Sequence, residues 1–364
     1  MLILAVMLAC RPAVLTDTFG PDDADSASAD SAESAEVLDD LPPAATEPEN
    51  PAVCFSELSR YEGEELLVYD LAWSPDGRRL ATGSVNLLRL YDVSEDGSLT
   101  LLDSVYSEDR FNSIQWSADG ALVYAPTGTH LMVFDASADK LRLASRGQRH
   151  TDDLQRVSLS PDGRLLLSCD VAGVTRLYDV TQAPSMSMLD AAEVHERCTR
   201  VAWSPDGAQA LSTGHDGDFV LYAVEDRALA VTDRFAAGEE TGEAIFGRDA
   251  TEAIGGSFGD INDLWYFEVD AGRLIERQRL EGHASGIGAL EWSHSGEYLL
   301  TGAHDHTMHV LERAPDGQGL QVLSDHPDDG GGVHSARWSP DDSRVARTGS
   351  SRDLLVIYDV VPCP

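Results

Sequence analysis

The sequence predicts an all-β protein built from seven repeated units of short antiparallel strands. A turn motif, Ser-x-Asp-Gly or a variant of it, recurs along most of the 364 residues at intervals of 43, 43, 44, 43, 46 and 46. An apolar residue, here called the marker residue, precedes each turn. The seven marker residues are Trp73, Trp116, Leu159, Trp203, Phe246, Trp292 and Trp338. Recurrence at this long period is typical of a structural unit that stacks on its neighbours.

A second motif closes each unit and stays in step with the first. Seven strand-like runs end at Val93, Ala136, Val180, Val224, Val269, Arg313 and Val360. Within the first motif, Pro-Asp-Gly supplies turn chemistry: Pro presets φ, Asp bonds its own backbone and Gly adopts a positive φ. In the sixth unit, residues 287–292, 297–303 and 308–313 are predicted strands. Four short strands per 43 residues make one blade of a β-propeller, so we predict seven blades over residues 53–364.

Charge excludes two classes of partner. The net charge is −37, from 63 acidic against 26 basic residues. Recognition of phosphate groups needs clustered Lys and Arg, so we expect no nucleic acid partner. An anionic membrane surface is excluded for the folded part by the same argument.

The first 52 residues differ from the rest of the chain. Residues 1–15 predict a leader: residues 1–10 are apolar, whereas a membrane span takes about 20 residues. Their end resembles a bacterial lipobox, so we expect Cys10 to carry a lipid, with a plain signal peptide as the alternative. Residues 16–52 are rich in Ala, Ser, Asp, Glu and Pro, which predicts a disordered acidic linker. The linker would hold the propeller away from a membrane, or serve only solubility.

The repeats resemble the WD-repeat family of β-propellers. The dipeptide that ends the third strand of the family's repeat appears here as Tyr91-Asp92, Phe134-Asp135, Tyr178-Asp179 and Tyr358-Asp359. The match to this dipeptide is weaker at Phe267-Glu268 and Leu311-Glu312, and Tyr222-Ala223 lacks its acidic residue. The periplasmic Tol-type propellers, which also use Ser-Pro-Asp-Gly turns, are an alternative that these endings disfavour.

The resemblance implies a buried hydrogen-bonded tetrad in some blades, formed by His, Ser or Thr, Asp and Trp. Two repeats supply three of its members: His195, Ser212 and Asp216 in one, and His283, Thr301 and Asp305 in the other. Tyr222 and Leu311 stand at the Trp position, so we expect both networks to be truncated.

The resemblance also implies that an N-terminal strand completes the last blade. Residues 53–60 would be that strand, which places Cys54 opposite Cys363 and predicts a disulfide in an oxidising compartment. Cys169 and Cys198 should lie on the same face of adjacent blades. They form a second candidate disulfide, or they are two small buried residues.

Signals for catalysis are weak. The sequence has no Gly-rich phosphate loop, no haem motif and no Gly-x-Ser-x-Gly elbow. The cluster from His304 to His309 contains metal-ligand residue types, but Asp305 is assigned to a tetrad, so we expect turn histidines and no metal. A propeller hydrolase or lactonase is the alternative function.

Binding is favoured at the loops before the first strand and after the second strand of each repeat. Arg156 and Arg200 stand three residues before their marker residues and could hold an anion or carboxylate, or pair with neighbouring Asp. The long loop from Asp325 to His334 would suit a cationic partner. Its candidate contact residues are His326, Asp328, Asp329 and His334.

We therefore expect a non-catalytic scaffold that binds a protein or peptide partner. The sequence predicts that it is a monomer that needs no cofactor. We expect it outside the cytoplasm of a bacterium, in the periplasm or at the cell surface, where its only link to the membrane is a lipid at Cys10.

Overall fold

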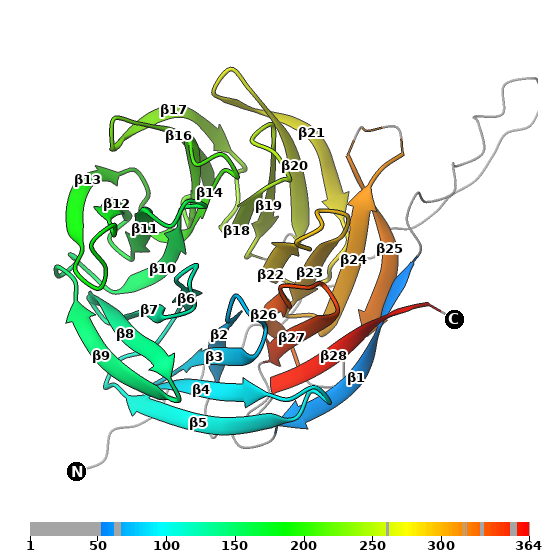
Figure 1. The fold of residues 1–364 in the computed structure, drawn as a ribbon. Helices are drawn as coiled ribbons and strands as arrows, with labels where there is room; N and C mark the ends of the chain where they lie inside the picture. Colours follow the sequence, from blue (N-terminus) through cyan, green and yellow to red (C-terminus); the bar gives the residue numbers. More distant parts are fainter. Residues whose placement is uncertain are drawn as a thin grey trace, which may run out of the picture. The chain divides into compact units, whose positions relative to one another are not determined.

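The computed structural model describes residues 52–61, 67–259, 262–315, 317, 319–327, 331–349 and 355–363. These residues form 28 strands in seven four-stranded antiparallel sheets. Figure 1 shows the sheets as blades around a common centre. The predicted all-β, seven-bladed propeller is confirmed. The predicted leader, Cys10 and all but one residue of the predicted linker lie outside the described residues.

Each blade presents its first strand to the central channel and its second strand behind that one. The inner strands of blades 1 to 7 are β2 (Val68–Trp73), β6 (Gln115–Trp116), β10 (Leu154–Leu159), β14 (Cys198–Trp203), β18 (Thr241–Phe246), β22 (Ile287–Trp292) and β26 (Val333–Trp338). The second strands are β3 (Arg79–Ser84), β7 (Leu122–Thr127), β11 (Leu165–Asp170), β15 (Gln209–Gly214), β19 (Glu252–Ser257), β23 (Leu299–Ala303) and β27 (Arg344–Gly349).

The third and outer strands complete the blades. The third strands are β4 (Leu87–Val93), β8 (His130–Ala138), β12 (Val174–Asp179), β16 (Asp218–Glu225), β20 (Asp263–Asp270), β24 (Thr307–Arg313) and β28 (Leu355–Pro362). The outer strands are β5 (Leu99–Tyr106), β9 (Lys140–Arg146), β13 (Ser187–Glu193), β17 (Ala228–Ala236), β21 (Arg273–Glu281), β25 (Leu320–Pro327) and β1 (Val53–Tyr61).

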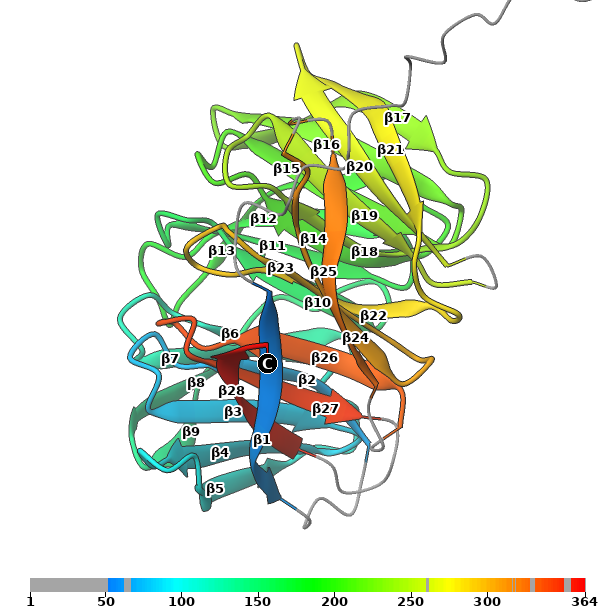
Figure 2. The ribbon, with the colours of Figure 1, turned by 90° about the vertical axis from the view of Figure 1, so that its right-hand side faces the viewer.

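The ring is closed by the strand from the beginning of the described chain. β1 pairs antiparallel with β28, from Val53 opposite Pro362 to Tyr61 opposite Leu355, and Figure 2 shows the two strands side by side. Cys54 and Cys363 form a disulfide with their Cα atoms 4.9 Å apart. Both the strand exchange and this disulfide were predicted from the sequence, and both are confirmed.

The recurring turn motif joins neighbouring blades as well as neighbouring strands. In blade 1 the Ser74 hydroxyl donates to the Asp76 carboxylate at 2.6 Å and accepts the backbone N–H of Arg79 at 2.9 Å. Gly77 closes the turn at φ 70°, a conformation that favours glycine. The Trp73 indole N–H donates to the carbonyl of Arg337 in blade 7 at 3.2 Å. Trp116 and Trp203 bond the preceding blade in the same way, so in blades 1, 2 and 4 the marker residue also fastens its blade to the one before it.

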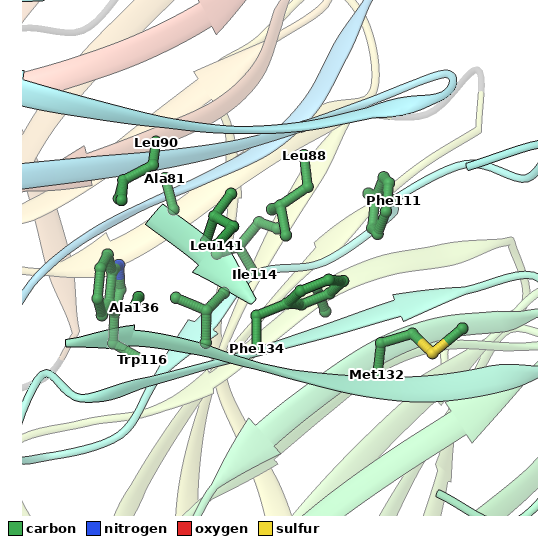
Figure 3. Packing of buried hydrophobic residues seen from close by; sticks show 12 residues of the cluster. Ala81, Leu88, Leu90, Phe111, Ile114, Trp116, Met132, Phe134, Ala136 and Leu141 are labelled. Carbon is green, nitrogen blue, oxygen red and sulfur yellow. The ribbon is translucent and has the colours of Figure 1, made fainter. Parts of the chain in front are cut away.

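Apolar side chains fill the space between blades. Between blades 1 and 2, Leu88 and Leu90 from β4 share one buried cluster with Ile114, Trp116 and Phe134 of the next blade (Figure 3). Neighbouring blades thus share apolar side chains, as expected for sheets that are buried on both faces. Among the described residues, none forms a helix of the length and apolarity that a membrane crossing requires.

Candidate binding site at the channel mouth

The propeller has two faces. At the loop face, the inner strands begin and the second strands end; at the opposite turn face lie the Ser-x-Asp-Gly turns.

In blade 4, a tetrad supports the loop face. His195 bonds Asp216 at 3.0 Å and Ser212 at 2.7 Å, and the Ser212 hydroxyl contacts the Tyr222 hydroxyl at 2.8 Å. The expected truncation is therefore wrong for this blade, because the phenol of Tyr222 takes the place of the indole.

The tetrad of blade 6 is truncated, as predicted. His283 bonds Asp305 at 3.2 Å and Thr301 at 2.8 Å, and Leu311 offers no polar atom. The network extends in another direction instead, since the His283 ring stacks on His309 with centroids 4.1 Å apart. Burial, with the nearby His309, lowers the pKa of His283 to about 4, so its imidazole is neutral at pH 7.

A third tetrad, in blade 3, was missed by the sequence analysis. His150 bonds Asp170 at 3.1 Å, Ser168 at 2.9 Å and the Tyr178 hydroxyl at 3.0 Å, and all four side chains are buried. The acid lies two residues after the Ser here, and four residues after it in blade 4. The available signal was the spacing of ten residues from Ser to Tyr, which blades 3 and 4 share.

Two of these tetrads stand beside members of a partly exposed set of rings, because Asp216 follows His215 in blade 4 and Asp305 follows His304 in blade 6. The rings, which we call the channel-mouth arc, come from five consecutive blades and touch in sequence. They are His215, Phe258, His304, His334 and Tyr69. The ring centroids are 6.2 Å apart from His215 to Phe258 and 5.6 Å from Phe258 to His304. They are 4.9 Å apart from His304 to His334 and 6.3 Å from His334 to Tyr69.

The arc is accessible and uncharged at its centre. Phe258 is 44% exposed. Burial lowers the pKa of His304, and burial with the nearby His304 lowers the pKa of His334 to about 4. Both imidazoles are therefore neutral at pH 7. A Cβ on Gly332 would come within 2.8 Å of the His304 Cα, so glycine is needed there for the loop to lie against the arc.

Beneath the arc lies a layer of charged side chains, here called the charged layer. Its members stand three or one residues before a marker residue. They are Asp70, Arg156, Arg200, Glu243, Glu291 and Arg337. Arg337 bonds Asp70 at 3.2 Å, and Arg200 forms an ion pair with Glu243 in which each side chain is 8% exposed. Burial raises the pKa of Asp70, but Arg337, Arg156 and Arg200 together lower it by more, so this carboxyl stays ionised.

The structure separates the two predicted arginines. Arg200 is already neutralised, and its partner is Glu243 of the next blade instead of the Asp considered from the sequence. Arg156 donates to the backbone carbonyls of Asn112 and Gln155 and forms no ion pair with a described carboxylate. Burial, with the nearby Arg200, lowers the pKa of Arg156 to about 10, which still leaves it charged at pH 7.

A cavity of about 580 Å³ runs from the charged layer toward the turn face. Asp70, Arg200 and Glu243 line one end of it, while Trp73 and Trp116 line it near the turns. Pockets that hold small ligands have volumes of about 300–1,000 Å³. The channel is therefore large enough to admit a small molecule.

The other predicted contact residues are dispersed. His334 belongs to the arc. His326 does not, because β25 extends to Pro327 and the imidazole packs on Phe55 of β1 with centroids 4.5 Å apart. Asp328 and Asp329 lie outside the described residues.

The remaining cysteines are not bridged. Cys169 and Cys198 are free, fully buried and in one apolar cluster between blades 3 and 4. The second candidate disulfide is therefore wrong, and the alternative of two small buried residues holds. Burial raises the pKa of the Cys198 thiol. Within the described ranges, no three side chains of His, Cys, Asp or Glu gather as ligands for a metal ion.

Comparison with known proteins defines the class. Residues 55–103, 143–179, 275–311 and 317–359 match the family model described as WD domain, G-beta repeat. This match identifies WD repeats in four stretches of the chain, and the structure arranges the repeats as a seven-bladed β-propeller. The match also favours the WD-repeat interpretation over the Tol-type alternative.

Several curated proteins are similar to this chain. Actin-interacting protein 1 of Drosophila melanogaster is 25% identical over 44% of this chain and 27% of its own length. Coronin-7 of Bos taurus is 31% identical over 45% of this chain and 19% of its own length. Cell division cycle 20.1, cofactor of APC complex, of Arabidopsis thaliana is 23% identical over 70% of this chain and 56% of its own length. The chain spans between about a fifth and just over half of these relatives.

Proposed function

We propose that this protein is a non-catalytic scaffold that holds a protein or peptide partner on its loop face. The observation that carries the proposal is the channel-mouth arc, in which five blades each contribute one ring to a single accessible surface. Aromatic side chains are enriched at protein interfaces because they bury a large area with little loss of conformational freedom. The tetrads of blades 4 and 6 hold the loops of His215 and His304 in place before a partner binds, which lowers the entropy cost of association.

Two further facts support a macromolecular partner. The names of two similar proteins state an interaction with actin and a role as cofactor of a complex. The charge of −37 favours a partner that carries positive charge around its contact surface, because opposite charge speeds encounter.

The proposal is tested by retention of partners from a membrane extract on the immobilised full chain. Phe258→Ala removes the most exposed ring of the arc and should reduce the retained partner at least tenfold. Val231→Ala is the matched control, since Val231 is 48% exposed but lies on the outer strand β17. If every retained protein is captured equally by both variants, the arc is not the binding surface.

We propose further that the protein works outside the cytoplasm, anchored by a lipid on Cys10. Support comes from the Cys54–Cys363 disulfide, since disulfides persist in oxidising compartments. Replacing Cys10 by Ala should move the protein from the membrane fraction to the soluble fraction. Unchanged fractionation would exclude the anchor and leave the scaffold proposal intact.

A further inference from the structure

The charged layer contains three guanidinium groups and three carboxyl groups, but only two of the guanidinium groups have a carboxylate partner. Asp70 binds Arg337 and also accepts from the Ser335 hydroxyl at 2.8 Å and the Ile114 backbone N–H at 3.0 Å. Its oxygens are therefore already engaged. Glu243 is engaged by Arg200.

Glu291 does not supply the missing partner. Its carboxylate accepts the backbone N–H of Trp338 at 2.6 Å, and it forms no ion pair with a described arginine. Burial raises the pKa of Glu291 to about 7, so near neutral pH it carries only part of a negative charge. The layer as a whole is therefore positive, in a protein whose net charge is strongly negative.

Arg156 is the guanidinium group of the layer that forms no ion pair with a described carboxylate, and Asp70 and Glu243 stabilise its charge only from a distance. Its two acceptors, the carbonyls of Asn112 and Gln155, are neutral. The Nε–H donors of Arg156 and of the neighbouring Arg200 are buried and meet no acceptor among the described residues. A buried donor without an acceptor costs free energy, and so does a half-buried charge that no carboxylate contacts, so an incoming anion would recover both costs.

We propose that Arg156, assisted by Arg200 on the next inner strand, binds one carboxylate group of a ligand at the channel mouth. A guanidinium matches a carboxylate because two parallel N–H donors meet its two oxygens. Arg156 and Arg200 stand at the same position of adjacent repeats, and Arg200 also lines the cavity of about 580 Å³.

The carboxylate can come from two sources. One is a free small dicarboxylate, for which the cavity offers room. The other is the C-terminal carboxylate of a bound peptide, and in that case the inference rests on the proposed function.

The test measures binding to the full chain by calorimetry and by the shift of its unfolding midpoint. The probes are succinate, with sodium chloride at matched ionic strength, and N-acetyl-Gly-Gly-Phe with a free or an amidated C-terminus. Arg156→Gln should lower the affinity for the bound probe at least tenfold. Arg164→Gln is the matched control, because Arg164 belongs to the same blade but is exposed in a turn. The control should bind as the wild type does.

The outcomes separate the sources and the two proposals. Binding of succinate alone identifies a free carboxylate as the ligand; preference for the free over the amidated peptide identifies a C-terminus. Equal response of the wild type and Arg156→Gln to every probe overturns the inference. Phe258→Ala should lose partner capture and keep succinate binding, so a failure of the arc and a failure of the arginine site give different results.

Folding of the test variant is expected to be preserved. Arg156→Gln leaves no carboxylate unpaired, so its unfolding midpoint without added anion should equal or exceed that of the wild type. Arg156→Lys provides a second variant, which keeps the charge but loses the forked donors, and its affinity should fall between the other two. If Lys binds as tightly as the wild type, the forked donors of Arg156 do not contribute and a bidentate contact is excluded.

Discussion

Replacing Cys54 and Cys363 together by serine is expected to lower the free energy of unfolding by about 5 kcal/mol. The disulfide joins residues that are 309 positions apart, so it restricts almost the whole unfolded propeller. In the chain-entropy account, a cross-link that closes a loop of this length contributes about 5 kcal/mol. The native ring should persist in the variant, because β1 remains paired with β28 from Val53 to Tyr61.

Urea unfolding of three samples tests this reasoning. These are the oxidised wild type, the wild type with reductant, and the double serine variant. The last two should unfold at the same, lower urea concentration, and reductant should not affect the variant. Labelling in denaturant before reduction should find at most three thiols, those of Cys10, Cys169 and Cys198. A variant as stable as the oxidised wild type would refute the argument, and would mean that strand pairing alone closes the ring.

Three further predictions concern the tetrads and the charged layer. Tyr222→Phe removes the hydroxyl that contacts Ser212 and should cost about 1 kcal/mol in urea unfolding. Glu243→Gln leaves Arg200 buried without its carboxylate, and should cost about 3–5 kcal/mol in the same measurement. Burial lowers the pKa of His283 from 6.5 to about 4, so protons bind the unfolded chain first and stability falls as the pH decreases from 6.5 toward 4. Thermal unfolding from pH 7.5 to 4.5 should show a shallower decrease in His283→Gln.

The fold could be predicted because its contacts are local in sequence and repeated. Each turn motif contains its own hydrogen bonds, as Ser74 and Asp76 show, and each repeat meets only its neighbours. The period therefore determines the number of blades. The closing strand was predictable only through the family resemblance, since nothing within Val53–Tyr61 indicates that its partner is the last strand of the chain.

The tetrads were predicted in part, for a physical reason. A sequence pattern searches for residue types at fixed positions, whereas the network requires only donors and acceptors within reach. The Tyr222 hydroxyl reaches Ser212 as an indole N–H would, and Asp170 reaches His150 from a strand end instead of a turn. A sequence pattern therefore does not detect a substitution that preserves the hydrogen bond but changes the residue type or its position.

Apart from His334, which was predicted as a contact residue, the channel-mouth arc left no signal in the sequence. Its rings come from different places in the repeat: Phe258 follows a second strand, whereas His334 and Tyr69 stand near the beginning of inner strands. Only the closed ring brings them together. The pairing of Arg200 with Glu243, by contrast, could have been predicted from the sequence, because Glu243 stands at the same position of the following repeat.

Two positions of the inner strands can be compared, one that maintains the fold and one that can carry function. Two residues before the marker, every repeat has an apolar residue, at Leu71, Ile114, Val157, Val201, Ala244, Leu290 and Ala336, and all seven are buried. One residue earlier, the repeats diverge to Asp70, Ser113, Arg156, Arg200, Glu243, Ala289 and Ser335. The side chain two residues before the marker packs between blades, so in all seven repeats the geometry of the propeller requires an apolar residue there. The second position supplies four of the six members of the charged layer, and its residue type differs from blade to blade. We therefore expect the chemistry specific to this protein to be concentrated three residues before the marker. Replacing Arg156 tests this expectation without changing the closed ring of blades.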